Sequence, residues 1–89
     1  MRPSKNQTLM QALATEIKAR RLALEMSQED LAGRCDLDRP YISLMEVARK
    51  QPTISVLLKL AEGLDYSLPE FMKRVMKRYE VESAAKEQV

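Results

Sequence analysis

The sequence lacks histidine and tryptophan, and its 89 residues include one cysteine, two glycines, four prolines and only 4% aromatic residues. With one cysteine and no histidine, the chain offers neither a metal cluster nor an internal disulfide, so we expect no metal and no cofactor. Scarce glycine and proline leave little material for the many turns of an all-β fold. With few aromatic residues the core must be aliphatic, which favours packed helices.

Charge and hydropathy exclude further classes of protein. The net charge is only +2, from 15 basic and 13 acidic residues, so charge alone does not indicate nucleic-acid binding. No apolar run approaches the ~20 residues that cross a bilayer, and we expect a cytoplasmic protein without membrane contact or signal peptide. An enzyme is not expected, because the chain has no phosphate-cradling glycine loop and too few residues for a catalytic pocket; no small-molecule ligand is evident.

Apolar residues recur at helical spacing in five segments that polar stretches separate. The pattern predicts five helices, which cover 7–25, 28–35, 39–47, 54–63 and 68–80. Around them we expect a flexible arm over 1–6 and a polar tail over 81–89, which can either extend the fifth helix or fray, with one domain over 7–80. The predicted fold is therefore all-α, compact and built of five helices.

The second and third helices each have a start signal. Ser27 is an expected N-cap with Asp30 three residues later, and Asp38 is the expected cap of the next helix, whose first turn tolerates Pro40. A short polar turn separates the two helices. Two short helices joined in this way have the layout of a helix-turn-helix, which inserts its second helix into the DNA major groove.

Helical spacing also predicts the apolar faces of the last two helices. The fourth is expected to bury Ile54, Val56, Leu57, Leu60 and Ala61. The fifth carries more apolar residues than a four-helix core needs, and we expect a homodimer interface there, formed by Leu68, Phe71, Met72, Val75, Met76 and Tyr79. The alternative is that these residues close the core of the monomer.

Over residues 13–72 the chain resembles the Xre-type, phage-repressor and Cro-like helix-turn-helix family. The resemblance is carried by Arg21, the block Ser27–Ala32, Leu37, Tyr41-Ile42-Ser43, Glu46, Pro52-Thr53 and the stretch Leu57–Leu64. The segment Asp38–Ser43 is especially similar to the recognition helix of small restriction–modification controller proteins. The resemblance implies a lambda-repressor-like domain in which residues 28–35 and 39–47 are the helix-turn-helix.

The chain departs from the family pattern at two turns. Where the family has a left-handed glycine between the two helices, this chain has Asp36, which tolerates that conformation at modest cost. Where a glycine often follows soon after Glu46, this chain has Val47-Ala48. We therefore expect that the third helix can extend by a turn.

The candidate DNA-binding residues are Gln28, Arg39, Pro40, Tyr41, Ser43, Leu44, Arg49 and Lys50. The resemblance implies that Gln28 contacts a phosphate and braces Arg39. The planar guanidinium of Arg39 can hydrogen-bond O6 and N7 of guanine, and the alternative is an ion pair with Asp36 or Asp38. Periodicity assigns the core to the neighbouring helix positions, so Tyr41 is expected to be exposed.

The other residues singled out are structural. The resemblance implies a partly buried ion pair between Arg21 and Glu46, which would tie the first helix to the end of the third. Cys35 lies among the apolar positions of the second helix and is expected in the core.

The function these features indicate is sequence-specific regulation of transcription. A homodimer would place one recognition helix of each copy in successive major grooves of a palindromic, double-stranded operator. The alternative is an antitoxin-type or adaptor protein that uses the same fold mainly to bind another protein, with Glu80, Glu82 and Glu87 available for such contacts.

Overall fold

The computed structural model describes residues 5–87, which form five helices and no strand. The helices are α1 (Gln7–Ala23), α2 (Gln28–Cys35), α3 (Arg39–Glu46), α4 (Ile54–Gly63) and α5 (Leu68–Glu87). The all-α prediction is confirmed. Within the described range, none of these helices is both long and apolar enough to span a bilayer.

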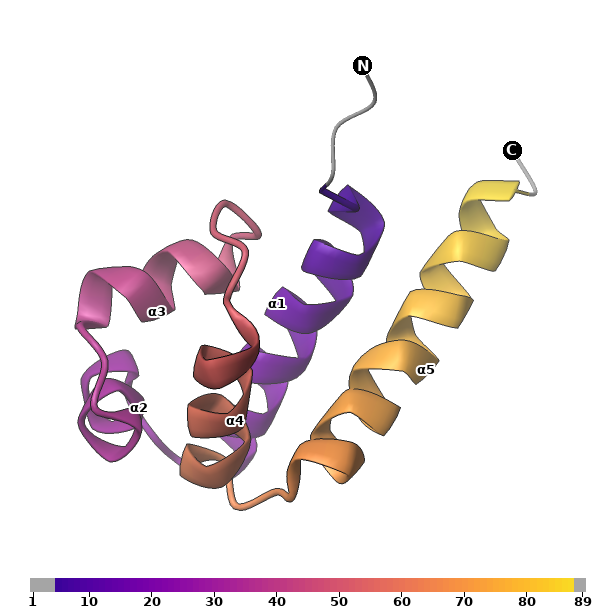
Figure 1. Cartoon of the computed structure of the whole chain (residues 1–89). Helices are drawn as coiled ribbons and strands as arrows, with labels where there is room; N and C mark the ends of the chain where they lie inside the picture. The colour runs from indigo at the N-terminus through magenta and orange to yellow at the C-terminus, as the bar shows by residue number, and fades with distance from the viewer. Residues whose placement is uncertain (1–4, 88–89) are drawn as a thin grey trace.

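α1 and α5 pack against each other, while α2 and α3 form a pair on the opposite side of the molecule (Figure 1). α4 lies between them and contacts both α2 and α5. Side chains from every helix meet in one aliphatic core. Its largest fully buried members are Phe71, Ile17, Leu31, Ile42, Met45, Leu60, Leu64 and Val75.

A buried carboxylate on α1 adds a polar connection to this packing. The Glu16 side chain accepts hydrogen bonds from Tyr66 Oη at 3.2 Å and from Arg78 Nε at 2.8 Å. Because burying an unpaired carboxylate is costly, the two donors fix where α5 lies along α1. The sequence analysis missed this contact, since its partners are 50 and 62 residues away from Glu16.

The N-terminal end of the described chain differs from the expected arm. Asn6 was expected in a flexible arm, but it caps α1 by accepting from the Leu9 amide at 3.0 Å, and its Nδ2 donates to Tyr79 Oη at 3.1 Å. Residues 1–4 and 88–89 lie outside the described residues. Between these limits, the segment 81–87 extends α5, which is one of the two alternatives that the sequence left open.

Side chains cap the helix starts where the sequence indicates, with one exception. Ser27 and Asp30 form a reciprocal capping box, and Thr53 accepts from the Val56 amide at 3.2 Å. Asp38 occupies the N-cap position of α3 but makes no side-chain cap hydrogen bond. A cap bonds the second or third amide of a helix; here the second residue is Pro40, and the Tyr41 amide donates to the Asp38 carbonyl.

Four helices end without a left-handed glycine. Within two positions after each of α1 to α4, one residue adopts a left-handed conformation, and these residues are Glu25, Asp36, Ala48 and Asp65, with φ between 54° and 60°. In each case the next amide bonds back five residues, as from Met26 to the Arg21 carbonyl at 3.0 Å. This is the Schellman arrangement, built here on residues that carry a Cβ and therefore adopt it at an energetic cost.

Burial corrects two expectations about the apolar faces. Phe71 and Val75 were expected in a dimer interface, but they are fully buried against the monomer's own core, because α5 packs its apolar stripe on α1. Leu68, Met72 and Tyr79 are half-buried against the same core, which leaves Met76 as the exposed member of that set. Ile54 was expected to be buried, but as the first residue of α4 it is 75% exposed.

Gly63 ends α4 but does not terminate it through a left-handed backbone, as none of the described glycines has a positive φ. Its role is close approach. A Cβ at this position would collide with Cys35 Sγ on α2 and touch Leu31 Cδ1 at 3.4 Å. The missing side chain therefore lets α4 pack directly on α2.

The close contact predicts that Gly63→Ala destabilises the fold. Helix propensity alone favours alanine by about 1 kcal/mol, whereas the collision with Cys35 costs about 1–3 kcal/mol, so the net change is a loss. Urea denaturation followed by circular dichroism measures it. Adding Cys35→Ala should make the loss from Gly63→Ala smaller than in the wild-type background, and equal losses in both would contradict the assigned contact.

The left-handed helix exits predict that Glu25→Gly stabilises the protein by about 1 kcal/mol, because glycine adopts this conformation without a Cβ penalty. Glu25 is exposed and accepts the change without loss of packing. Thermal unfolding should show a higher midpoint. Lys18→Gly, on the exposed face within α1, is the matched control and should lower the midpoint instead.

Candidate nucleic-acid interface

A buried ion pair holds the last residue of α3 against α1. Arg21 Nε and Nη2 donate to Glu46 Oε2 at 2.7 Å and Oε1 at 2.9 Å, and Arg21 Nη1 donates to the Met26 carbonyl at 2.8 Å. The two side chains are only 9% and 3% exposed. The hydrogen bonds that Arg21 donates to Glu46 raise the pKa of Arg21, so its guanidinium stays charged. The structure thus brings together the two residues that the family resemblance pairs.

Gln28, the first residue of α2, joins the same carboxylate. Its Nε2 donates to Glu46 Oε1 at 3.2 Å, so one carboxylate connects α1, α2 and α3. Gln28 also lines a shallow surface hollow together with Arg39, at the adjacent starts of α2 and α3. The bond that the structure records for its side chain runs to Glu46 and not to Arg39, which corrects the expected brace.

The two faces of α3 have opposite characters. Ile42 and Met45 are fully buried, whereas Arg39, Pro40 and Leu44 are exposed and Ser43 is half-exposed. Among the described residues Arg39 forms no salt bridge, so the alternative of an ion pair with Asp36 or Asp38 is absent there. The outward face therefore presents an available guanidinium at the first turn of the helix.

Tyr41 is half-buried and packs against the core, although periodicity predicted an exposed ring. The ring still has an outward role, because Lys50 Nζ lies 5.6 Å from its centroid, within the range of a cation–π contact. Arg49 and Lys50 are both exposed. The loop after α3 therefore holds two cations beside the exposed face of the helix.

α3 ends at Glu46, so the expected extra turn does not form. Val47 is the C-cap, and Ala48 takes the left-handed conformation with φ 58° that glycine would adopt more easily. Its methyl group is buried in a small cluster with Met10 and Ala14 of α1, which offsets the cost. Gln7 Nε2 donates to the Ala48 carbonyl at 3.2 Å, a contact with the loop that the sequence analysis did not find.

Cys35 lies in the core as predicted, at 3% exposure. Burial raises the pKa of its thiol to about 11, so the group is protonated at neutral pH and not nucleophilic. The cysteine acts here as a small apolar side chain at the contact of α2 with α4.

The geometry of the ion pair predicts that Glu46→Ala destabilises the domain by about 3–5 kcal/mol, because it leaves a buried, unpaired guanidinium. This is a large part of the stability of a small domain. Chemical denaturation measures the loss, and Glu62→Ala on the exposed face of α4 should leave stability nearly unchanged. The double variant Arg21→Met/Glu46→Leu should recover much of the loss; a double variant as unstable as Glu46→Ala would contradict this account.

Comparison with known proteins agrees with this geometry. A helix-turn-helix family profile matches residues 17–71. Control protein C.SmaI of Serratia marcescens is 33% identical over 66 residues, which cover 74% of this chain and 79% of that protein. The restriction-modification controller protein C.Esp1396I, solved as a tetramer in complex with its natural 35 base-pair operator, matches with a TM-score of 0.75 and 37% identity over 80% of this chain and 93% of that one. The clp gene regulator ClgR of Corynebacterium glutamicum shares the fold, with a TM-score of 0.81 at 19% identity over 97% of this chain and 89% of that one. The chain belongs to the helix-turn-helix family that includes the restriction–modification controller proteins.

Proposed function

We propose that the protein is a cytoplasmic, sequence-specific DNA-binding regulator of transcription that acts as a homodimer, and that it binds its operator without catalysing a reaction. Its relatives support this, since one carries the name control protein and another was solved on its natural operator. The proposal assigns α3 to the major groove, where its exposed face would meet the edges of the bases.

The observation that carries the proposal is the state of Arg39. The residue is exposed, forms no salt bridge within the described part of the chain, and begins a helix whose far end the buried Arg21–Glu46 pair fixes. A guanidinium held in this way can donate two parallel hydrogen bonds to O6 and N7 of guanine. Pro40 and Leu44 on the same face are apolar and suit contact with a thymine methyl group.

The residues around α3 suit the DNA backbone. Ser43 and the two loop cations Arg49 and Lys50 can reach phosphates, as can the Gln28 amide at the start of α2. At the start of α3, Pro40 has no amide hydrogen and the Tyr41 amide bonds the Asp38 carbonyl, so the Arg39 amide is the donor that can meet a phosphate oxygen, and the helix dipole favours that contact. Tyr41 contributes mainly by placing Lys50.

The small number of base pairs that one recognition helix can contact favours a homodimer. One eight-residue helix contacts only a few base pairs, and a second copy related by two-fold symmetry doubles them. Half-sites then lie ~34–36 Å apart, one turn of the double helix.

The assignment of Arg39 predicts that Arg39→Ala loses base discrimination. After selection of operator sites from random DNA, the variant should bind the selected site about 10-fold or more weaker and lose preference at one position of each half-site, because a bidentate contact contributes ~1–3 kcal/mol. Gel-shift or anisotropy titrations against the selected site and its single-base variants measure the change.

Lys50→Ala is the matched control, since it removes a cation from the same surface and leaves the sequence of α3 unchanged. It should weaken binding to all sequences alike and reduce the salt dependence of binding. An equal loss on every sequence for Arg39→Ala would refute its role in reading bases while leaving DNA binding itself intact.

A further inference from the structure

Tyr66, in the turn between α4 and α5, holds two arginines from different helices. The guanidinium carbon of Arg20 lies 4.3 Å from the centroid of its ring and that of Arg74 lies 5.2 Å from it, both within the range of cation–π contacts. Arg20 Nε also donates to the Leu64 carbonyl at 2.9 Å. Two like charges are therefore held beside one ring, and the DNA-binding function uses neither of them.

α5 adds three further cations beside this pair. Lys73 and Lys77 lie one helical turn apart, as do Arg74 and Arg78, so these four side chains form two adjacent rows along the helix. Three of them are exposed, while Arg20 and Arg78 are half-buried. We call the set of Arg20, Lys73, Arg74, Lys77 and Arg78 the α1–α5 basic surface.

The chain neutralises only part of this positive charge. Arg74 Nε pairs with Glu70 at 3.2 Å and Arg78 Nε with Glu16 at 2.8 Å, whereas the other three cations form no salt bridge in the described part of the chain. Counting Glu16, Glu70 and the neighbouring Glu82 against the five cations leaves a charge of +2, equal to the net charge of the whole chain. The remainder of the chain is neutral in sum, so this surface carries a local excess of positive charge.

A shallow hollow of about 310 Å³ lies at the edge of the α1–α5 basic surface. Lys77, Arg78, Val81 and Glu82 line it, and Val81 is 65% exposed. The aliphatic stems of lysine and arginine side chains can cover apolar groups while their charged ends stay in water. The surface therefore offers a place for one apolar side chain next to its cations.

The α1–α5 basic surface is remote from the helix proposed to bind DNA. α1 and α4 lie between α5 and α3, and the turn that carries Tyr66 is at the opposite end of the molecule from the loop after α3 (Figure 1). A duplex bound along the outward face of α3 would leave this surface uncovered.

We propose that the α1–α5 basic surface binds an acidic helical segment of another protein, with its carboxylates on the cations and one apolar side chain in the hollow. Carboxylates one helical turn apart on such a segment match the two rows of cations on α5. The site is separate from the DNA surface, so a bound regulator could recruit an acidic partner to its operator.

The carboxylates of this surface favour a protein segment over a second duplex. A duplex carries one negative charge per ~1.7 Å of its axis, so its phosphates would also meet Glu70 and Glu82 at the two ends of the rows. A peptide can place its carboxylates selectively and avoid both. It also supplies the apolar group that the hollow accepts and that a phosphate backbone lacks.

Arg20 is already positioned for such a partner. Its stacking on Tyr66 and its bond to the Leu64 carbonyl restrict the side chain before anything binds. Less conformational entropy is then lost when its remaining N–H groups bond a carboxylate, for which the planar guanidinium is well suited.

The test is a titration of the full-length, ¹⁵N-labelled protein with a helical peptide of about 14 residues, long enough to form a helix, that carries four glutamates one turn apart and one leucine among alanines. The amide signals of Arg20 and of Lys73 to Glu82 should shift and saturate, and the dissociation constant should rise with salt. The same peptide with glutamines in place of the glutamates should give no shift.

Lys77→Glu should raise the dissociation constant at least about 5-fold, because it replaces an attraction by a repulsion at an exposed position that the fold does not need. Lys59→Glu is the matched control, since it makes the same change at an exposed position of α4 outside the surface and should leave binding unchanged. Val81→Ser removes the apolar side of the hollow and should weaken binding about 3-fold.

The other outcomes overturn the inference. It fails if the peptide gives no shift, if the glutamine peptide binds equally well, or if Lys77→Glu and Lys59→Glu weaken binding alike. Shifts confined to α2, α3 and the loop after α3 would show that the peptide occupies the DNA surface instead. A duplex of random sequence that shifts the signals of α5 when the peptide does not would assign the surface to nucleic acid. The titration contains no operator, so a failure to select operator sites would refute the proposed function without affecting this result.

Discussion

Two charges buried between helices, those of Arg21 and Glu46, fix the orientation on which the rest of this structure depends. Apolar packing is not directional, so Ile42 and Met45 alone would leave α3 free to adjust its rotation. The carboxylate of Glu46 accepts from Arg21 on α1 and Gln28 on α2, and Arg21 also bonds the Met26 carbonyl between them. With every donor and acceptor satisfied, only one arrangement of three helices keeps both charges paired.

This constraint matters because α3 cannot hold its own position. A helix of eight residues is unstable in isolation, and α3 also lacks a side-chain cap. Its conformation therefore comes from its surroundings, with Asp36 making the turn before it and Ala48 the turn after it, both in the left-handed conformation. The outward direction of Arg39 is a consequence of contacts that Arg39 does not itself make.

Much of this fold could be predicted from the sequence because it depends on local chemistry. The contacts between residues far apart in the sequence could not be predicted in this way. Ser27 and Asp36 act within three residues of their own position, and each takes the expected role. Helical spacing found the apolar stripe of α5 but could not show whether Phe71 and Val75 face α1 or a second copy, because both solutions have the same period. Ile54 fits the apolar pattern of α4, yet it lies beyond the edge of the monomer's core. Gly63 lies at the end of a predicted helix, and only the position of Cys35 on another helix shows that the missing side chain leaves room for close packing. For the candidate site, the start signals and helical spacing identified which residues lie on α3. The contact of Gln7 with the loop after α3 could be found only in the structure.

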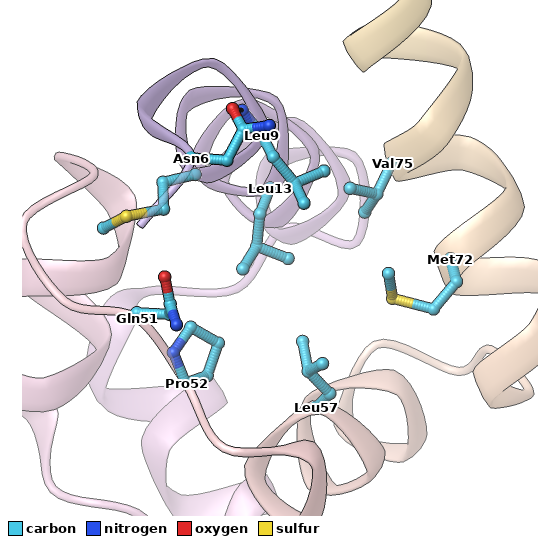
Figure 2. Close-up of a pocket in the computed structure, with 9 residues that line it drawn as sticks. Asn6, Leu9, Leu13, Gln51, Pro52, Leu57, Met72 and Val75 are labelled. Carbon is cyan, nitrogen blue, oxygen red and sulfur yellow. Dashed lines mark hydrogen bonds between the residues drawn. The ribbon is translucent and has the colours of Figure 1, made fainter. Parts of the chain in front are cut away.

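The segment between α3 and α4 carries the cations of the surface proposed for DNA. Arg49 and Lys50 are exposed beside α3, and the two residues after them, Gln51 and Pro52, line an apolar pocket between α1, α4 and α5 (Figure 2). The start of this segment is held by the bond from Gln7 to the Ala48 carbonyl, and its end by the Thr53 cap of α4. The positions of the loop cations therefore depend on contacts that they do not themselves make, as the position of Arg39 does. The same small core that fixes α3 from behind also fixes the loop that follows it, so the surface proposed for DNA is held through both its helix and its loop.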